Sequence, residues 1–323
     1  MTLGPSSETD SVLTRLARTA GRFRLNASHL SPEDCTRWLD RLDALAASTG
    51  LAHPVAVDLQ GAKMRLGRLP ACEVGAGRLE LVLAAESSSP GRLPVPHPEL
   101  FWHVQPGERL TLNDGRVELL VETVHDERLS ARVLQGGPLD SRKGINRAAH
   151  PIPVGRLSLS DEAMLKAIAG FPRLELAYSF ALDGSEAALL RGAKATRLIA
   201  KVERVEALEN AGRLAAAFDE LWMGRGDLCE QCGFQRLGPL QESFESTLAA
   251  LGKPALLGGQ VLEHMTHFPS PTRSEVVHLH GLPGRGWAGI VLSDETAVGL
   301  YPIAVADFLD RMLALRGSMS VAW

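Results

Sequence analysis

Short apolar segments that end in polar or glycine residues recur along this chain and alternate with stretches of helical spacing. Each segment has the length of a strand and is apolar throughout, as are strands that are buried on both faces of a parallel sheet. Polar residues where strands end are typical of the functional face of a (β/α)8 TIM barrel, so the sequence predicts this α/β fold. The clearest segments are residues 54–59, 197–203, 220–227, 254–259 and 289–295.

The helical stretches carry their own start signals. From residue 13 to residue 49 apolar positions recur at helical spacing, and Ser31 followed by Pro32 supplies a cap and a first helical residue. Helical spacing returns at residues 159–168 and around residues 307–315. We expect helices in all three regions.

One long region interrupts the alternation of strands and helices. Between residues 68 and 152 the chain has few helical periods, and alternating segments are separated by Gly, Pro and Asn-Asp-Gly turns. This pattern predicts a small all-β domain inserted into the barrel. The expected domains are therefore residues 1–67 for the first part of the barrel, 68–152 for the insert and 153–323 for the second part.

Composition excludes several classes of protein. Hydrophobic residues make up 45% of the 323 residues and charged residues 22%, and no apolar stretch approaches the length of a membrane span. The net charge of -4 and the scattered basic residues argue against a nucleic-acid partner. The first residues lack a secretory pattern and the four cysteines are scattered, so we expect a reducing, cytoplasmic setting.

Three charged residues fall at the ends of two consecutive predicted strands. Lys201 and Glu203 close one strand and Asp227 closes the next. Carboxylates can hold Mg²⁺ there while a lysine offsets the charge of a transferring phosphoryl group. A structural salt bridge is the alternative interpretation of the same residues.

Eight short motifs follow one another along the chain. They are RLNASH (24–29), DLQGAKMRLG (58–67), LNDG (112–115), SRKGIN (141–146), IAKVE (199–203), MGRGDL (223–228), SPTRSE (270–275) and LSDETAVGLYP (292–302). In this order they resemble the successive motifs of pyruvate kinases. A further segment, TLGPSS at residues 2–7, resembles the first barrel strand of that family, and the insert resembles its β-barrel-like lid domain.

The resemblance implies Mg²⁺-dependent (or Mn²⁺-dependent) phosphoryl transfer between phosphoenolpyruvate and ADP, with ATP and pyruvate as products. It implies that Glu203 and Asp227 bind the metal. The implied catalytic residues are Lys201, Arg24 and Arg65. The implied substrate-binding residues are Gly226, Asp227, Arg24 and Lys201, with the amides of the first two at a helix start. The implied nucleotide-binding residues are Arg65, His29, Asn26, Asp114, Lys143 and Asn146.

This chain departs from the family motif at the monovalent-cation site. The residues of this chain that correspond to the site are Asn26, Ser28, Asp58, Leu59 and Lys63. The usual family sequence D-T-K-G-P-E-I-R-T is replaced by D-L-Q-G-A-K-M-R-L, and relatives with this lysine typically need no potassium. An ammonium beside the site can substitute for K⁺, so we expect that K⁺ is not required.

A second departure concerns the proton that completes the reaction. Gly259 stands where the family has a threonine that is implicated in protonating the enolate. Loss of a general acid lowers a rate by about 10²- to 10⁴-fold. Two alternatives to the kinase therefore stay open: an enolate-forming lyase or aldolase that acts on pyruvate or an oxo acid, and a catalytically weak relative that binds a phosphometabolite.

The resemblance ends near the last predicted helix, so we expect no C-terminal regulatory domain, and a homodimer through the barrel is possible.

Two other groups of residues are weaker signals. Cys229 and Cys232 have the spacing of half a zinc site, but no second half is evident. Four histidines are interpreted as core or solvated residues on two helices, the first pair after Gln260 and the second on the next helix. They are His264, His267, His278 and His280.

Overall fold

The computed structural model describes residues 1–89, 91–113, 115–147 and 156–318, and it divides into two compact units. The first, here called the barrel unit, comprises Met1–Gly61, Leu157–Gly226 and Gly238–Trp323. The second, here called the β unit, comprises Ala62–Arg156 and Asp227–Leu237. Each unit has its own sheet, and the two are described separately below.

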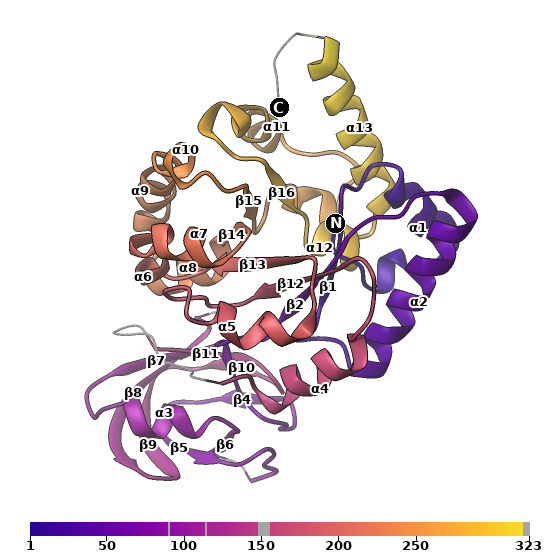
Figure 1. The fold of residues 1–323 in the computed structure, drawn as a ribbon. Helices are drawn as coiled ribbons and strands as arrows, with labels where there is room; N and C mark the ends of the chain where they lie inside the picture. Colours follow the sequence, from indigo (N-terminus) through magenta and orange to yellow (C-terminus); the bar gives the residue numbers. More distant parts are fainter. Residues whose placement is uncertain (90, 114, 148–155, 319–323) are drawn as a thin grey trace. The chain divides into compact units, whose positions relative to one another are not determined.

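A curled parallel sheet forms the centre of the barrel unit (Figure 1), as the alternating pattern predicted. Its strand order is β1-β2-β12-β13-β14-β15-β16, so that strands follow one another around the sheet in chain order. The bounds are β1 Phe23–Asn26, β2 Val55–Leu59, β12 Leu174–Tyr178, β13 Arg197–Val202, β14 Glu220–Gly224, β15 Ala255–Gly258 and β16 Gly289–Val291.

The segment Met1–Leu3 lies at the seam between the first and last of these strands. Thr2 forms a parallel bridge with Arg24 of β1, and its amide donates to the carbonyl of Leu292 just after β16, at 3.1 Å. Leu3 N donates to Arg24 O at 2.9 Å. These bonds join the two edges of the curled sheet, which explains why a motif at the very start of the chain resembles a barrel strand.

Charged residues fill the end of the barrel interior where the strands begin. Glu220 accepts hydrogen bonds from Arg22 at 2.5 and 2.9 Å, from Arg197 at 2.5 Å and from Trp222 Nε1 at 2.6 Å. Glu175 lies 2.6 Å from Arg22. Apolar residues occupy the adjoining layer: Ala56, Ala177, Ile199, Trp222 and Val291.

Helices follow most of the strands and surround the sheet (Figure 1). Helix α2 (Pro32–Thr49) begins as predicted, because Ser31 caps it, Pro32 occupies its first turn and Asp34 completes a capping box. The other predicted helices are confirmed as α4 and α13. Helices outside the insert are α1 Asp10–Ala17, α4 Leu159–Ile168, α5 Ala187–Leu190, α6 Val205–Glu209, α7 Ala211–Ala217, α8 Arg225–Cys232, α9 Phe234–Glu245, α10 Leu248–Leu251, α11 Arg273–Gly281, α12 Asp294–Ala297 and α13 Pro302–Ser318.

Some expected boundaries were wrong. The segment read as a strand to Asp227 ends at Gly224, and α8 begins at once at Arg225. His264 belongs to a short 3-10 helix, Glu263–Thr266, and His267 follows it, so these two histidines do not share a regular α-helix. Their short helix follows a loop in which Gln260 is left-handed, with a φ of 55°.

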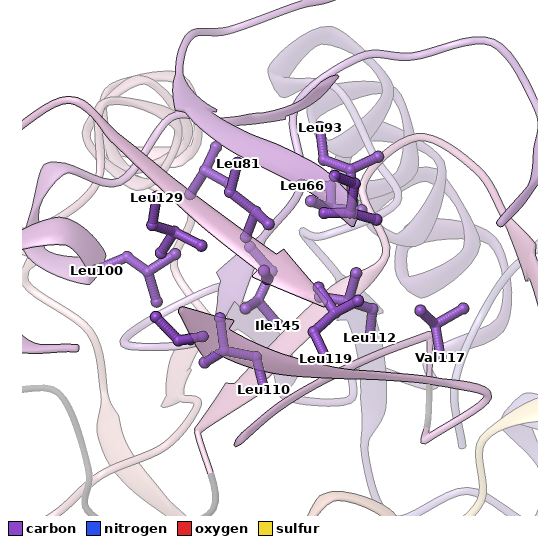
Figure 2. Close-up of a cluster of buried hydrophobic side chains, with 14 of the residues drawn as sticks. Leu66, Leu81, Leu93, Leu100, Leu110, Leu112, Val117, Leu119, Leu129 and Ile145 are labelled. Carbon is purple, nitrogen blue, oxygen red and sulfur yellow. The ribbon is translucent and has the colours of Figure 1, made fainter. Parts of the chain in front are cut away.

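The β unit contains a seven-stranded sheet of order β3-β11-β7-β8-β9-β5-β6 and a two-stranded sheet, β10-β4. A left-handed Asn113 and Gly115 turn the chain between β7 and β8. Leucines and other apolar side chains pack together within the unit, as Figure 2 shows. The elements are β3 Met64–Arg65, β4 Cys72–Val74, β5 Arg78–Leu83, β6 Arg92–Val95, α3 Pro98–His103, β7 Arg109–Leu112, β8 Val117–His125, β9 Arg128–Gln135, β10 Gly137–Leu139 and β11 Gly144–Arg147.

Within the described ranges, no helix combines the length and the apolar sequence that a bilayer crossing requires.

A buried carboxylate holds the point at which the chain leaves the barrel unit. Asp161, in the first turn of α4, accepts hydrogen bonds from Gln60 N and Gly61 N, both at 3.0 Å. Gly61 has a φ of +58°, and a Cβ there would lie 2.3 Å from Ser179 O, so only glycine fits this turn. Burial raises the pKa of Asp161 to about 6, although the two amide hydrogen bonds oppose that shift.

We expect this carboxylate to make stability depend on pH. Because folding raises its pKa, the folded state favours the protonated form, and ionisation opposes folding. The contribution is fully favourable below about pH 4 and is lost as pH rises towards 6, by on the order of 2 kcal/mol. Urea unfolding across this range should show that fall in the wild type and in the exposed control Glu162→Gln, and its loss in Asp161→Asn. An equal fall in Asp161→Asn would contradict the assignment.

Candidate functional site

Asp58 is the centre of a buried cluster at the carboxyl end of the barrel strands. Arg24 Nε and Nη2 donate to Asp58 Oδ2 at 2.8 and 2.5 Å. Lys201 Nζ lies 3.1 Å from the same oxygen, and the Ser179 hydroxyl donates to Oδ1 at 3.1 Å. Strands β1, β2, β12 and β13 are neighbours in the parallel sheet. Residues of these strands therefore meet, although Arg24 and Lys201 are 177 positions apart in the sequence.

The electrostatics of this cluster favour charged side chains despite burial. Burial opposes ionisation of Asp58, which is 1% exposed, but Lys201 and Arg24 outweigh it and lower its pKa. Burial likewise opposes the charged form of Lys201, but Asp58 and Glu203 raise its pKa. Lys201 is therefore a fixed ammonium at neutral pH.

Glu203 follows β13 directly, and each of its two carboxylate oxygens has a partner. Its Oε1 lies 2.8 Å from Lys201 Nζ, and its Oε2 accepts from Phe180 N at 3.1 Å. Phe180 donates from a left-handed conformation, with a φ of 59°, which is strained for a bulky residue. Strain of this kind persists only where the surroundings over-determine it, and here it aims an amide at the carboxylate.

Space around Glu203 depends on a glycine of the next strand. A Cβ at Gly224 would lie 2.8 Å from both Glu203 Cγ and Oε1. The carboxylate thus occupies a cradle that any larger residue would fill. A buried carboxylate in such a cradle is a suitable hard-oxygen ligand for Mg²⁺.

Asp227, the other predicted metal ligand, lies in the first turn of α8 and belongs to the β unit. Lys63 Nζ lies 2.5 Å from its Oδ1. A carboxylate is also the correct donor type for Mg²⁺, so both predicted residues fit the metal in chemistry. Among the residues that the structure describes, no group of three or more Asp, Glu, His or Cys side chains comes together as a metal site.

Gly226 and Gly259 lie close together in the barrel unit. Gly259 has a φ of +87°, and a Cβ there would lie 3.2 Å from Arg225 N and 3.3 Å from Gly226 N. Arg225 Nε and Nη2 donate to Gly259 O at 2.8 and 2.5 Å. The glycine backbone therefore packs directly against the start of α8, where the amide nitrogens that the sequence analysis singled out are located.

The predicted nucleotide-binding residues of the β unit lie on or next to its strands. Arg65, on β3, donates from Nη1 to Arg142 O at 2.9 Å, and its amide donates to His97 Nε2 at 3.1 Å. Asn146, on β11, donates to the Glu230 carboxylate. Lys143 precedes β11 and is half-buried. Asp114 lies outside the described residues.

The remaining predicted residues lie at the ends of β1 and β2. Asn26 Oδ1 accepts from Ser28 N at 3.1 Å in the turn that follows β1. His29 is exposed and its amide donates to Asn26 O. Leu59 is fully buried on β2. Asn26, Ser28, Asp58 and Leu59 thus share one end of two paired strands, whereas the ammonium of Lys63 is paired with Asp227 in the β unit.

Comparison with known proteins identifies the family. A family model described as pyruvate kinase, barrel domain, matches residues 1–306. This chain belongs to the pyruvate kinase family. A pyruvate kinase of Agrobacterium vitis is 32% identical over 325 residues, which cover 97% of this chain and 67% of that protein. A pyruvate kinase of Methylorubrum extorquens is 28% identical over 317 residues (96% and 66%). Pyruvate kinase II of Salmonella typhimurium is 32% identical over 326 residues (96% and 68%).

The chain thus covers about two thirds of the length of these pyruvate kinases, which is 67%, 66% and 68% respectively. The family model confirms the predicted family and agrees with the barrel fold. We state the activity, substrates and ligands of this pyruvate kinase family member below as a proposal.

Three residues of the pyruvate kinase scaffold were missed by the sequence analysis. The Ser179 hydroxyl accepts from Lys201 Nζ at 2.9 Å, and Thr2 Oγ1 accepts from Arg24 Nη1 at 2.9 Å. Arg225 holds the Gly259 loop. Ser179 does stand directly after a buried strand, which was a usable signal, but β12 itself was not among the predicted strands. Thr2 and Arg225 lie within the motifs TLGPSS and MGRGDL, but nothing in these motifs indicates which groups their side chains contact.

The cradle around Glu203 gives a direct test. We expect Gly224→Ala to lower the turnover of the reaction proposed below by at least about tenfold, because the methyl group displaces the Glu203 carboxylate. Gly212→Ala in α7, where a Cβ meets nothing within 4 Å, is the matched control and should keep wild-type turnover. Steady-state rates with matched thermal melts separate the effect from unfolding. Wild-type turnover in Gly224→Ala would show that the cradle is not needed.

Proposed function

We propose that this protein transfers a phosphoryl group between phosphoenolpyruvate and ADP in a Mg²⁺-dependent reaction, as a pyruvate kinase. The observation that supports this function best is the buried ammonium of Lys201, which contacts Asp58, Ser179 and Glu203 at the carboxyl end of the barrel strands. A fixed cation at this place can stabilise the charge on a transferring phosphoryl group.

Each predicted residue has a physical role in the proposal. Lys201 and Arg24 offset the charge of the phosphoryl group, and the amides of Gly226 and Asp227 at the start of α8 bind the substrate carboxylate. Glu203 and Asp227 hold Mg²⁺, which when bound neutralises charge on the phosphates. Nucleotide contacts come from Arg65, His29, Asn26, Asp114, Lys143 and Asn146.

Potassium independence is also proposed. Lys63 stands at the departure from the family motif, and it brings a positive charge to a sequence position that carries a glutamate in potassium-dependent relatives. Asn26, Ser28, Asp58 and Leu59 would form a remnant of the monovalent-cation site. Several-fold activation by K⁺ over Na⁺ would count against this part of the proposal.

The proton-transfer step departs from the family pattern at Gly259. We propose that a water molecule or a nearby side chain protonates the enolate, because this residue has no side chain to do so. A lyase that acts on a larger substrate would need Gly259 to open space for it. A Cβ at Gly259 would meet Arg225 and Gly226 at 3.2 to 3.3 Å, so the missing side chain leaves little room, and this position does not favour the lyase.

The experiment is a direct assay of the purified protein with phosphoenolpyruvate, ADP and Mg²⁺, in which ATP and pyruvate are both measured. We expect equal amounts of the two products. Glu203→Gln should reduce turnover by at least about 10²-fold, since it removes a carboxylate ligand. Glu209→Gln, an exposed carboxylate on α6, is the matched control and should be unchanged. Absence of both products with the wild type would refute the kinase function.

A further inference from the structure

Asp227 is paired with a lysine inside the β unit. Lys63 Nζ lies 2.5 Å from Asp227 Oδ1, and the two side chains are only 14% and 15% exposed. Both ions have therefore lost most of their water. An ion pair of this kind attracts more strongly than an exposed one, and removal of one partner leaves a poorly solvated charge.

The position of Lys63 is fixed by strand pairing. Two residues after it, Arg65 of β3 pairs with Gly144 of β11. The lysine stem passes over Gly144, where a Cβ would lie 3.4 Å from Lys63 Cε. The sheet of the β unit thus presents the ammonium from one defined direction, which excludes a freely moving surface lysine.

A second contact joins α8 to β11, the strand that pairs with β3. Asn146 of β11 donates to Glu230, which lies three residues after Asp227 on the same side of the helix. This contact does not involve Lys63. Release of Lys63 from Asp227 therefore leaves α8 attached through Asn146 and Glu230, so an exchange of partners at Asp227 is a local event.

We propose that Lys63 and the divalent metal compete for the carboxylate of Asp227, so that metal binding releases the ammonium. The inference rests on the proposed function, in which Asp227 is a metal ligand. An ammonium on Oδ1 and a divalent ion on the same carboxylate repel each other at short distance, and the lysine also supplies the neutralising charge in advance. Lys63 is thus a positioning residue. It lowers the affinity of Asp227 for the metal, because metal binding has to displace the ammonium from the carboxylate.

The test is the equilibrium binding of Mn²⁺ to the full chain, without nucleotide, followed by electron paramagnetic resonance. We expect Lys63→Gln to lower the Kd for Mn²⁺ by about tenfold, because the competing charge is gone. Lys63→Arg keeps the charge and should retain wild-type affinity. Lys166→Gln removes an exposed lysine of α4 and is the control for net charge. Asp227→Asn should weaken binding strongly, whichever residue occupies position 63.

Thermal melts supply a second readout. A double-mutant cycle of Lys63→Gln and Asp227→Asn should show coupling in Tm without Mn²⁺, and that coupling should disappear at saturating Mn²⁺. Unchanged or weaker Mn²⁺ binding in Lys63→Gln, with Asp227→Asn still defective, would overturn the competition while the metal assignment stands. Mn²⁺ binding that is insensitive to Asp227→Asn would instead remove the metal assignment, and with it the premise from the proposed function.

Discussion

Replacement of Lys201 by methionine should reduce turnover of phosphoenolpyruvate and ADP by about 10³-fold or more. The variant loses the fixed positive charge that the proposed mechanism places against the transferring phosphoryl group, and losses of this size follow removal of a comparable cation in phosphoryl-transfer enzymes. The stem of methionine is similar in length, so packing changes little. Steady-state kinetics that measure ATP and pyruvate, with Lys166→Met on the exposed face of α4 as control, would show the loss.

The same substitution should lower stability, and the loss should depend on pH. Without Lys201 the carboxylates of Asp58 and Glu203, which are 1% and 4% exposed, lack the cation that lies between them. Breaking a buried pair of this kind costs about 3 to 5 kcal/mol. The pKa of Asp58 should rise in the variant, because Lys201 is the first of the charges that lower it, so the deficit relative to the wild type should shrink as pH falls from 7 towards 5. A deficit that is constant over this range, or turnover within tenfold of wild type, would contradict the role given to Lys201.

Replacement of Glu220 by glutamine should lower stability without lowering activity. We expect the free energy of unfolding to fall by about 2 to 4 kcal/mol and turnover to stay within about twofold of the wild type. Glu220 is 2% exposed and accepts from Arg22, Arg197 and Trp222 at the end of the barrel where strands begin. Burial opposes its charge, but the hydrogen bond with Arg22 and the other donors lower its pKa. Its stabilisation is therefore present above about pH 4.3 and is lost as pH falls through the lowered folded pKa.

Glu175 is the matched comparison for Glu220 because it faces the same two arginines. Burial raises its pKa although Arg22 and Arg197 oppose the shift, and its 2.6 Å contact with Arg22 Nε does not have hydrogen-bond geometry. Glu175→Gln should therefore lower the free energy of unfolding by less than about 1 kcal/mol. Urea unfolding at pH 7 orders the two variants. Equal losses in both would mean that the network acts only through its net charge.

The strand pattern predicted the architecture of the barrel because buried parallel strands are apolar throughout, a signal that survives without tertiary knowledge. The boundaries between strands and helices were harder to predict from the sequence. Residues 225–227 carry no periodicity, so a strand end and a helix start look alike there, although an acidic residue in the first turn does favour the helix. The start of α8 is set by its contact with the Gly259 loop, to which Arg225 is bonded.

The sequence predicted individual site residues, but it did not predict which side chains contact one another. The sequence singled out Asp58, Lys201 and Arg24, but the hydroxyl of Ser179 joins them from the position directly after β12, 121 residues after Asp58. Nothing in the sequence indicated that the ammonium of Lys63 is paired with Asp227, which lies 164 positions away. Pairings over such distances depend on which strands are neighbours and on which way a side chain turns, and neither is encoded in local pattern. The left-handed Phe180 was equally inaccessible, because nothing about a phenylalanine favours that conformation.

The seam at Met1–Leu3 has a consequence for the order of folding. Thr2 and Leu292 are separated by 290 residues, and closing a loop of that length has a large entropic cost before its hydrogen bonds offer any gain. The other neighbouring strands of the sheet can pair as successive units, each adding to the one before. We therefore expect the ring of strands to close last and to open first at this seam, so that amide hydrogen exchange is faster in the first three residues than in the central strands of the sheet.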